Sequence, residues 1–359
     1  MFGLVTAEFL PASLLTPMAT DLGISEGMAG QAVTATALVG LVASLLISAA
    51  TRSIDRRRVL LSFTVLLIVA NLMVAFAPNL PVLLTGRVLL GIALGGFWAI
   101  STAVAMRLVP EALVPRALSM IVSGVAAATI VAAPLGSYVG KMWGWRSVFL
   151  LATVLGAVTF VVQFATLPAM APNAATRLRT LVDVLARPGV GWGLLAAMLV
   201  FSGHFAFFTY IRPHLEIVTD GSITAVPGML LGFGVANFLG SLFAGLLAER
   251  SLRRTLMTVP RVMGLLGFAL LSVGSLPLAN AVMIALWWLA RTVPDQAESA
   301  GGLLVAAIQF AIAIGAAGGG LIFDVGGAQG VFSVSSVVLV LAAVMIFIRV
   351  RPQVVAAPA

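Results

Sequence analysis

A single carboxylate, Glu8, stands in the apolar stretch VTAEFLPASLL (residues 5–15), with no charged neighbour for several residues on either side. A charge at the centre of a membrane costs about 2.5–3.5 kcal/mol on insertion scales, so Glu8 is expected to face the protein interior or water. Burial favours the neutral form of a carboxyl group, and such a group can load and release a proton near neutral pH. Glu8 is therefore predicted to couple to protons; the alternative is a structural acid tied to a neighbouring helix or reaching the interface.

Arg87 lies in a second apolar stretch, LTGRVLLGIALGG (84–96). Arginine stays protonated, so it needs an acid, a backbone carbonyl or an anionic substrate group as its partner. Glu8 is the expected partner, and Arg87 would then tune the proton affinity of that carboxyl group; the alternative is an arginine near a helix end that reaches the interface. Gly91 and Gly95 form a GxxxG pattern, which predicts close packing of two helix backbones.

The stretch FSGHFAFFTYIRP (201–213) is rich in aromatic side chains. Four of its residues follow the i, i+3, i+4, i+7 spacing that places them on one helix face. Aromatic rings can stack on a planar nucleobase and a histidine can bond its polar edge; the alternatives are a lipid-facing stripe and a helix-bridging histidine. The residues predicted to bind substrate are Phe201, His204, Phe205, Phe208, Tyr210 and Gln309.

Two loops, TRSIDRRR (51–58) and GLLAERSLRR (245–254), each pair an acid with an arginine. Their equivalent places in the two parts of the chain predict charge locks that hold one conformation; the alternative is ordinary loop charge. The small-residue stretch AAPLGSYVG (132–140) predicts a kinked helix face with a related role. The residues assigned to conformational gating are Asp55, Arg56, Glu249, Arg250, Pro134 and Gly136.

Composition and the absent motifs exclude several functions. The chain of 359 residues is 61% hydrophobic and only 9% charged, against about 25% charged in soluble domains, so its solvent is expected to be lipid. It has no cysteine, no H-E-x-x-H and no P-loop. GISEG (23–27) matches G-x-S-x-G but follows no strand, so Ser25 is predicted to cap a helix. We expect no enzyme, no metal site and no cofactor.

Apolar runs of about 20 residues predict an all-α membrane protein with twelve transmembrane helices. Polar residues 168–189 are expected to form a cytoplasmic linker between two six-helix halves, 1–167 and 190–359. The first and tenth spans are expected to be short. The predicted spans lie near 1–19, 28–50, 59–77, 80–104, 117–140, 146–167, 190–211, 226–248, 255–276, 278–290, 300–323 and 329–349.

The net charge of +8 comes mostly from arginines in alternate loops. This is the positive-inside pattern, which places those loops and both termini in the cytoplasm and disfavours nucleic-acid binding.

The motifs resemble the Major Facilitator Superfamily, in its drug:proton antiporter-like branch. The loop Asp55-Arg56-Arg57-Arg58 resembles the family signature between spans two and three, although Thr51 and Arg58 replace usual glycines. Arg87 with Gly91 resembles the span-four motif linked to proton coupling. Pro134 with Gly136 resembles the span-five antiporter motif.

Four segments are similar to bacterial family members that export purine ribonucleosides: EFLPASLLTPMATDLGISEGMAGQAVT (8–34), GIALGGFWAIS (91–101), RLVPEALVPRALS (107–119) and FFTYIRP (207–213). The resemblance implies a major facilitator protein that exports inosine- and guanosine-like nucleosides in exchange for protons. We expect it to act by alternating access in the bacterial inner membrane, as a monomer without a cofactor. The alternatives are export of sugars or drugs, and a non-transporting receptor or an inactive, truncated carrier.

Overall fold

The computed structural model describes residues 1–172, 190–220, 222, 224–273 and 301–349. All regular secondary structure in these residues is helical. The elements are α1 (Phe2–Leu22), α2 (Glu26–Ala50), α3 (Arg56–Ala75), α4 (Leu80–Leu108), the short 3-10 helix η1 (Glu111–Leu113), α5 (Val114–Trp143), α6 (Trp145–Thr166), α8 (Val190–Thr209), α9 (Ile211–Val218), α10 (Ala225–Val273) and α12 (Gly301–Arg349).

Local sequence explains where the first helices begin and end. Gly23 ends α1 with a positive φ of 64°, a conformation that costs glycine little. Ser25 begins α2, and its hydroxyl accepts a hydrogen bond of 3.0 Å from the amide of Met28. This confirms Ser25 as a helix cap.

Eight of the described helices are long and apolar enough to cross a membrane. The expectation of a short first span is wrong: α1 has 21 residues, or about 31 Å, which matches a hydrocarbon core of about 30 Å. Helix α10 covers two predicted spans, and α12 covers two more, separated by non-helical backbone at Gly327. The tenth span (278–290) lies outside the described residues, and the count of twelve stays a prediction.

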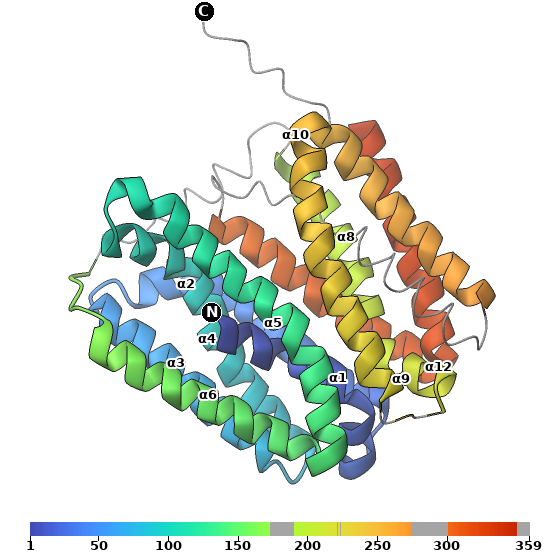
Figure 1. The fold of residues 1–359 in the computed structure, drawn as a ribbon, viewed down its shortest axis with the longest axis horizontal. Coiled ribbons are helices and arrows are strands. Elements are labelled where there is room, and N and C mark those ends of the chain that lie inside the picture. Colours follow the sequence, from blue (N-terminus) through green and yellow to red (C-terminus); the bar gives the residue numbers. More distant parts are fainter. Residues whose placement is uncertain (173–189, 221, 223, 274–300, 350–359) are drawn as a thin grey trace, which may run out of the picture.

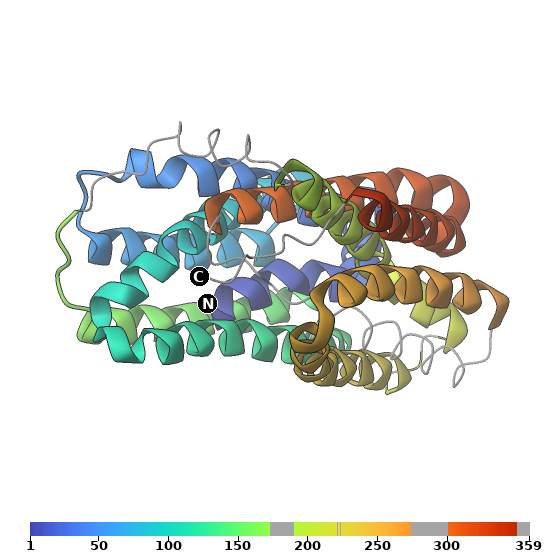
Figure 2. The same ribbon diagram turned by 90° about the horizontal axis from the view of Figure 1, so that it is seen from above.

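The helices form two groups that lie side by side in both views (Figures 1 and 2). We call α1–α6 the N-terminal group and α8, α9, α10 and α12 the C-terminal group. The first part of α12 leaves its own group and runs along α2. One end of the N-terminal group, the basic end, carries Arg56 and Arg107; the opposite end carries the turns at Gly23 and Gly144. A division into six-helix halves stays a prediction.

Small residues bring α2 and α4 together, as the GxxxG pattern predicted. A Cβ on Gly91 would lie 2.6 Å from the carbonyl oxygen of Thr36, and one on Gly95 would overlap the backbone at Gly40. Arg87 and Glu8 lie on helices packed in the same group, so this contact helps to set their spacing.

We predict that Gly91→Ala lowers the stability of the protein in detergent by about 1–3 kcal/mol, because the added methyl group meets backbone that cannot move away. Thermal unfolding measures the loss. The matched control is Gly193→Ala on α8, where a Cβ meets nothing within 4 Å. Equal melting temperatures for the two variants would contradict the packing described here.

Candidate functional site

Helix α1 is interrupted in its hydrogen bonding by Pro11 and Pro17. Proline has no N–H, so Pro11 leaves the carbonyl of Ala7 without its usual intrahelical donor. Arg87 of α4 takes the place of that donor, with its Nη1 2.7 Å from the carbonyl oxygen of Ala7. The free carbonyl of α1 therefore has a charged partner on a neighbouring helix.

The same guanidinium makes two further hydrogen bonds. Its Nη2 donates to the main-chain carbonyl of Glu8 at 3.0 Å, and its Nε donates to the carbonyl of Ala32 on α2 at 3.0 Å. Arg87 is 1% exposed, which rules out the interface position for this residue. Arg87 thus joins α4 to both α1 and α2.

Glu8 was the expected partner of Arg87, and the two residues are in contact, but not through the carboxylate. Arg87 contacts Glu8 through the main-chain carbonyl, and no salt bridge joins it to the Glu8 carboxylate within the described residues. Its charge still acts on that carboxylate through space. One physical reason is Pro11, because the carbonyl of Ala7 that it leaves without a helical donor binds the guanidinium in place of the carboxylate.

The carboxyl group of Glu8 meets the C-terminal group. Glu8 is 6% exposed, and the side chain of Gln309 on α12 makes a hydrogen bond to its carboxyl group. Gln309 is itself buried, and its Oε1 has no hydrogen-bond partner among the described residues. A carboxyl group and a neutral amide therefore face each other across the boundary between the two groups.

An aromatic cluster lies beside this pair. The ring of Phe9, next to Glu8 in sequence, lies 6.1 Å from that of Phe205 and 5.5 Å from that of Phe208. Phe208 also stacks on Phe233 of α10, at 5.9 Å between centroids. Sequence reasoning missed Phe9 and Phe233, although the position of Phe9 directly after Glu8 was a usable signal.

The helix face predicted on α8 is present as a set of touching rings. Phe201 stacks on Phe205 at 6.4 Å, and His204 lies 4.9 Å from Phe205 and 6.1 Å from Phe208, centroid to centroid. Phe205 and Phe208 are buried, so the alternative of a lipid-facing stripe is wrong for them.

Tyr210 lies apart from this cluster. Its hydroxyl donates to the carbonyl of Ala316 at 3.0 Å, and its ring stacks on Phe323 at 5.1 Å. It also fills the space above Gly30 of α2. In this structure Tyr210 packs the two groups together, with its donor already used.

The predicted charge lock at Asp55 and Arg56 is not formed as an ion pair between the two residues in this structure. Asp55 caps α3, accepting from the amides of Arg57 at 2.8 Å and Met170 at 2.9 Å. Arg56 donates to the hydroxyl of Thr51 at 2.7 Å. These contacts join the start of α3 to the preceding turn and to Met170, which follows α6, and none of them reaches the C-terminal group. The side chains of Glu249 and Arg250 lie outside the described residues.

Pro134 and Gly136 bring α5 against neighbours from both groups. Gly136 packs on Ser13 of α1, where a Cβ would lie 2.7 Å from the hydroxyl oxygen. Pro134 removes the donor for the carbonyl of Ile130, and Gly234 of α10 approaches that carbonyl so closely that a Cβ would lie 2.9 Å from its oxygen.

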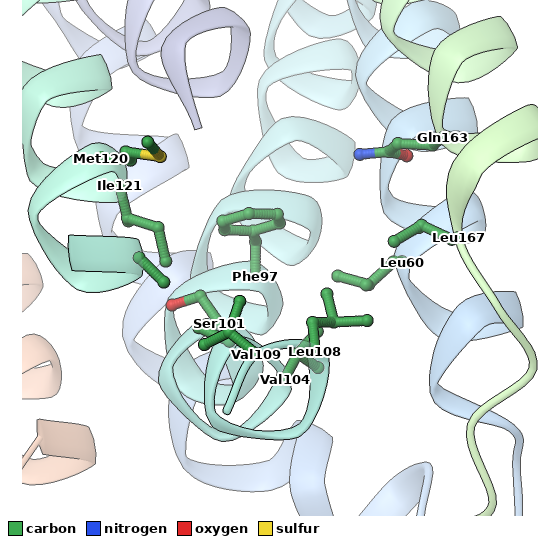
Figure 3. Close-up of a pocket in the computed structure, with 12 residues that line it drawn as sticks. Leu60, Phe97, Ser101, Val104, Leu108, Val109, Met120, Ile121, Gln163 and Leu167 are labelled. Atoms are coloured by element: carbon green, nitrogen blue, oxygen red, sulfur yellow. The ribbon is translucent and has the colours of Figure 1, made fainter. Parts of the chain in front are cut away.

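A cavity of about 280 Å³ lies elsewhere, near the basic end and between α3, α4, α5 and α6 (Figure 3). Its wall is almost wholly apolar, with Phe97, Leu108 and Met120 among the lining side chains. Gln163 is one of its few polar residues, and its Oε1 already accepts a hydrogen bond of 2.6 Å from Thr64. This cavity lies outside the Glu8 site.

A family model and a solved structure agree on the fold of this chain. The family model described as the Major Facilitator Superfamily matches residues 1–293. A solved structure titled D-xylose-proton symporter has a TM-score of 0.75, covers 97% of this chain and 95% of its own, and is 16% identical, which supports the fold alone.

Two curated relatives are equally similar in sequence but differently named. The purine ribonucleoside efflux pump NepI of Salmonella enteritidis is 41% identical over 361 residues, covering 97% of this chain and 91% of that protein. A protein of Pseudomonas aeruginosa named transcription regulatory protein OpdE is 41% identical over 369 residues, covering 98% and 92% respectively.

We predict that Arg87→Lys destabilises the folded protein, because one ammonium group cannot reach carbonyls on both α1 and α2. Loss of one charge-assisted hydrogen bond costs about 1.5–3 kcal/mol, measured as a lower melting temperature. Arg107→Lys is the control, since Arg107 donates to the carbonyl of Ala171 at an exposed site. Equal melting temperatures for the two variants would show that the hydrogen bonds from Arg87 to the carbonyls of Ala7, Glu8 and Ala32 do not stabilise the protein.

Proposed function

The chain belongs to the Major Facilitator Superfamily, and from that membership we propose that it exports purine ribonucleosides in exchange for protons. The observation that carries the proposal is the buried Glu8, whose carboxyl group is bonded to Gln309 of the other helix group. A proton taken up at this boundary changes the charge between the two groups, and it can therefore change how they fit together.

The Glu8–Gln309 pair suits both protonation states. An ionised Glu8 accepts a hydrogen bond from the amide of Gln309. A neutral Glu8 has an O–H to donate, and the Oε1 of Gln309 lacks a partner among the described residues. The site can therefore lose its charge without leaving a buried polar group unsatisfied, which keeps a neutral, occluded state accessible.

The aromatic cluster supplies the substrate surface. Rings from α1, α8 and α10 meet beside Glu8, and aromatic side chains stack on bases at about 1–3 kcal/mol per base. We propose that Phe201, Phe205 and Phe208 hold the purine, with His204 and Gln309 at its polar edge. Binding there would compete with the proton on Glu8, as antiport requires.

The orientation follows from charge. We propose that the basic end faces the cytoplasm of a bacterial cell, with the protein in the inner membrane, both termini cytoplasmic and two six-helix halves made of twelve spans. The contacts of Tyr210 and Asp324 with the N-terminal group would then close the external side in this structure. The carrier is proposed to act as a monomer.

A non-transporting role is the second candidate, favoured by one observation, the equal identity to a relative named as a transcription regulatory protein. A regulator of this kind would bind ligand without moving it. Export of sugars or drugs is the other alternative. Competition separates these, because excess inosine should inhibit nucleoside uptake by everted vesicles, whereas excess arabinose should not.

We predict that radiolabelled inosine accumulates in everted vesicles when a pH gradient is imposed, and that Glu8→Gln abolishes the gradient-dependent part. Glutamine keeps the size and hydrogen bonding of the side chain but cannot bind the proton. Correct insertion is checked by detergent extraction and a monodisperse elution profile.

Glu111→Gln is the matched control, since Glu111 is an exposed acid at the basic end. It is expected to leave accumulation unchanged. Gradient-driven transport that survives in Glu8→Gln would remove Glu8 from the coupling mechanism, and no transport by well-folded wild-type protein would favour the second candidate.

A further inference from the structure

The second proline of α1 also leaves a carbonyl without its helical donor. Pro17 has no N–H for the carbonyl of Ser13, four residues earlier. The Nη1 of Arg212, at the start of α9, donates to this carbonyl oxygen. Arg212 is 4% exposed, so the bond is shielded from solvent. It links α1 to the C-terminal group, and α9 lies next to the lower end of α1 in Figure 1.

Several charged groups surround this contact. Arg212 also donates through Nε to Glu216, one turn further along α9, at 2.8 Å. Glu26 of α2 and Asp324 of α12 interact with each other through space, and Glu26 also interacts with Arg212 and Glu216. Arg212 is the cation of this cluster that bonds a backbone carbonyl of the other group.

A second inter-group contact lies at the same end. The carboxylate of Asp324 accepts from the hydroxyl of Ser25 at 3.1 Å and from the amide of Gly27 at 3.2 Å. It therefore meets the positive end of α2, where a negative charge is stabilising. Asp324 is exposed, whereas Arg212 is buried, so the arginine bond is the one that excludes water.

We propose that Arg212 is a positioning residue for transport. At the end of the protein opposite the basic end, its hydrogen bond to the carbonyl of Ser13, which Pro17 leaves without a helical donor, holds the N-terminal and C-terminal groups together. We call this bond the latch. The inference rests on the proposed function, because alternating access requires this end to open. Arg212 does not touch the aromatic cluster in the contacts described, so it acts through the position of α1, which carries Glu8.

The latch favours two discrete states. When closed, both the guanidinium and the carbonyl are satisfied; when fully open, water satisfies both. A half-open state leaves a buried charge and a buried carbonyl without partners, which is costly. The bond therefore stabilises the closed state without holding the protein in partly open ones.

Pulsed electron paramagnetic resonance measures the opening directly. The chain has no cysteine, so spin labels go on Met28→Cys and Val325→Cys, two exposed positions on different groups at this end. The two labels flank the contact between Gly27 and Asp324, so the closed form gives a short distance that broadens the continuous-wave spectrum, and only the open form enters the range of the pulsed measurement. With Arg212→Met the long-distance population is expected to rise, with the ratio of open to closed forms changing on the order of tenfold, as for loss of one charge-assisted hydrogen bond. An unchanged distance distribution in folded protein overturns the latch.

Arg146 provides a matched control at the same end. It also pairs with an acid, Asp21, and donates to a main-chain carbonyl, that of Ala77 at 2.9 Å, but all three residues lie in the N-terminal group. Arg146→Met is expected to leave the label distances unchanged. If it lengthens them as much as Arg212→Met does, any loss of an arginine at this end separates the groups, and the proposal is wrong. Arg212→Lys, which keeps one charged donor, is expected to restore the closed population in part.

Pro17→Ala tests the same bond without removing the arginine, should Arg212→Met fail to fold. Alanine restores an N–H that competes for the Ser13 carbonyl, so a smaller shift in the same direction is expected. The distances do not depend on transport. If they shift while wild-type protein moves no inosine, the proposed function fails and the latch stands; transport without a shift in either variant removes the latch alone.

Discussion

Every backbone carbonyl inside a membrane needs a hydrogen-bond donor, and α1 lacks two of its own intrahelical donors because it contains Pro11 and Pro17. The two prolines release the carbonyls of Ala7 and Ser13, and each is bound by a buried arginine. Arg87 belongs to the same helix group as α1, whereas Arg212 belongs to the other. One bond therefore holds the N-terminal group together, and the other joins it to the C-terminal group, from which it would part in the proposed transport cycle.

This division explains why Glu8 lies where it does. Arg87 holds the carbonyls of Ala7 and Glu8 together, so the backbone that carries the acid is fixed while its carboxyl group stays available. The carboxyl group meets Gln309, and Phe9 meets Phe205 and Phe208. The proposed proton site, Glu8, and part of the aromatic cluster, Phe9, thus lie side by side on one helix, so a ligand that displaces Phe9 would also displace Glu8.

Much of this was readable from residue types. The bounds of α2 to α6 follow the apolar runs to within a few residues, whereas α10 continues without a break through the loop predicted at 245–254. The burial of Glu8 and the aromatic face of α8 follow from periodicity and charge cost. The acceptor of Arg87 was not readable, because an arginine alone does not distinguish a carboxylate from a carbonyl; Pro11, four residues after Ala7, was the overlooked signal. Arg212 and Asp324 depend on contacts between distant segments, which local patterns do not encode.

The proposed antiport depends on the mutual exclusion of nucleoside and proton at Glu8. Its most direct test is proton release from purified, protonated protein in weakly buffered detergent when inosine is added. Wild-type protein is expected to acidify the solution to an extent that saturates with inosine, and Glu8→Gln is expected to cause no acidification. Inosine binding to wild-type protein with no proton release would contradict it.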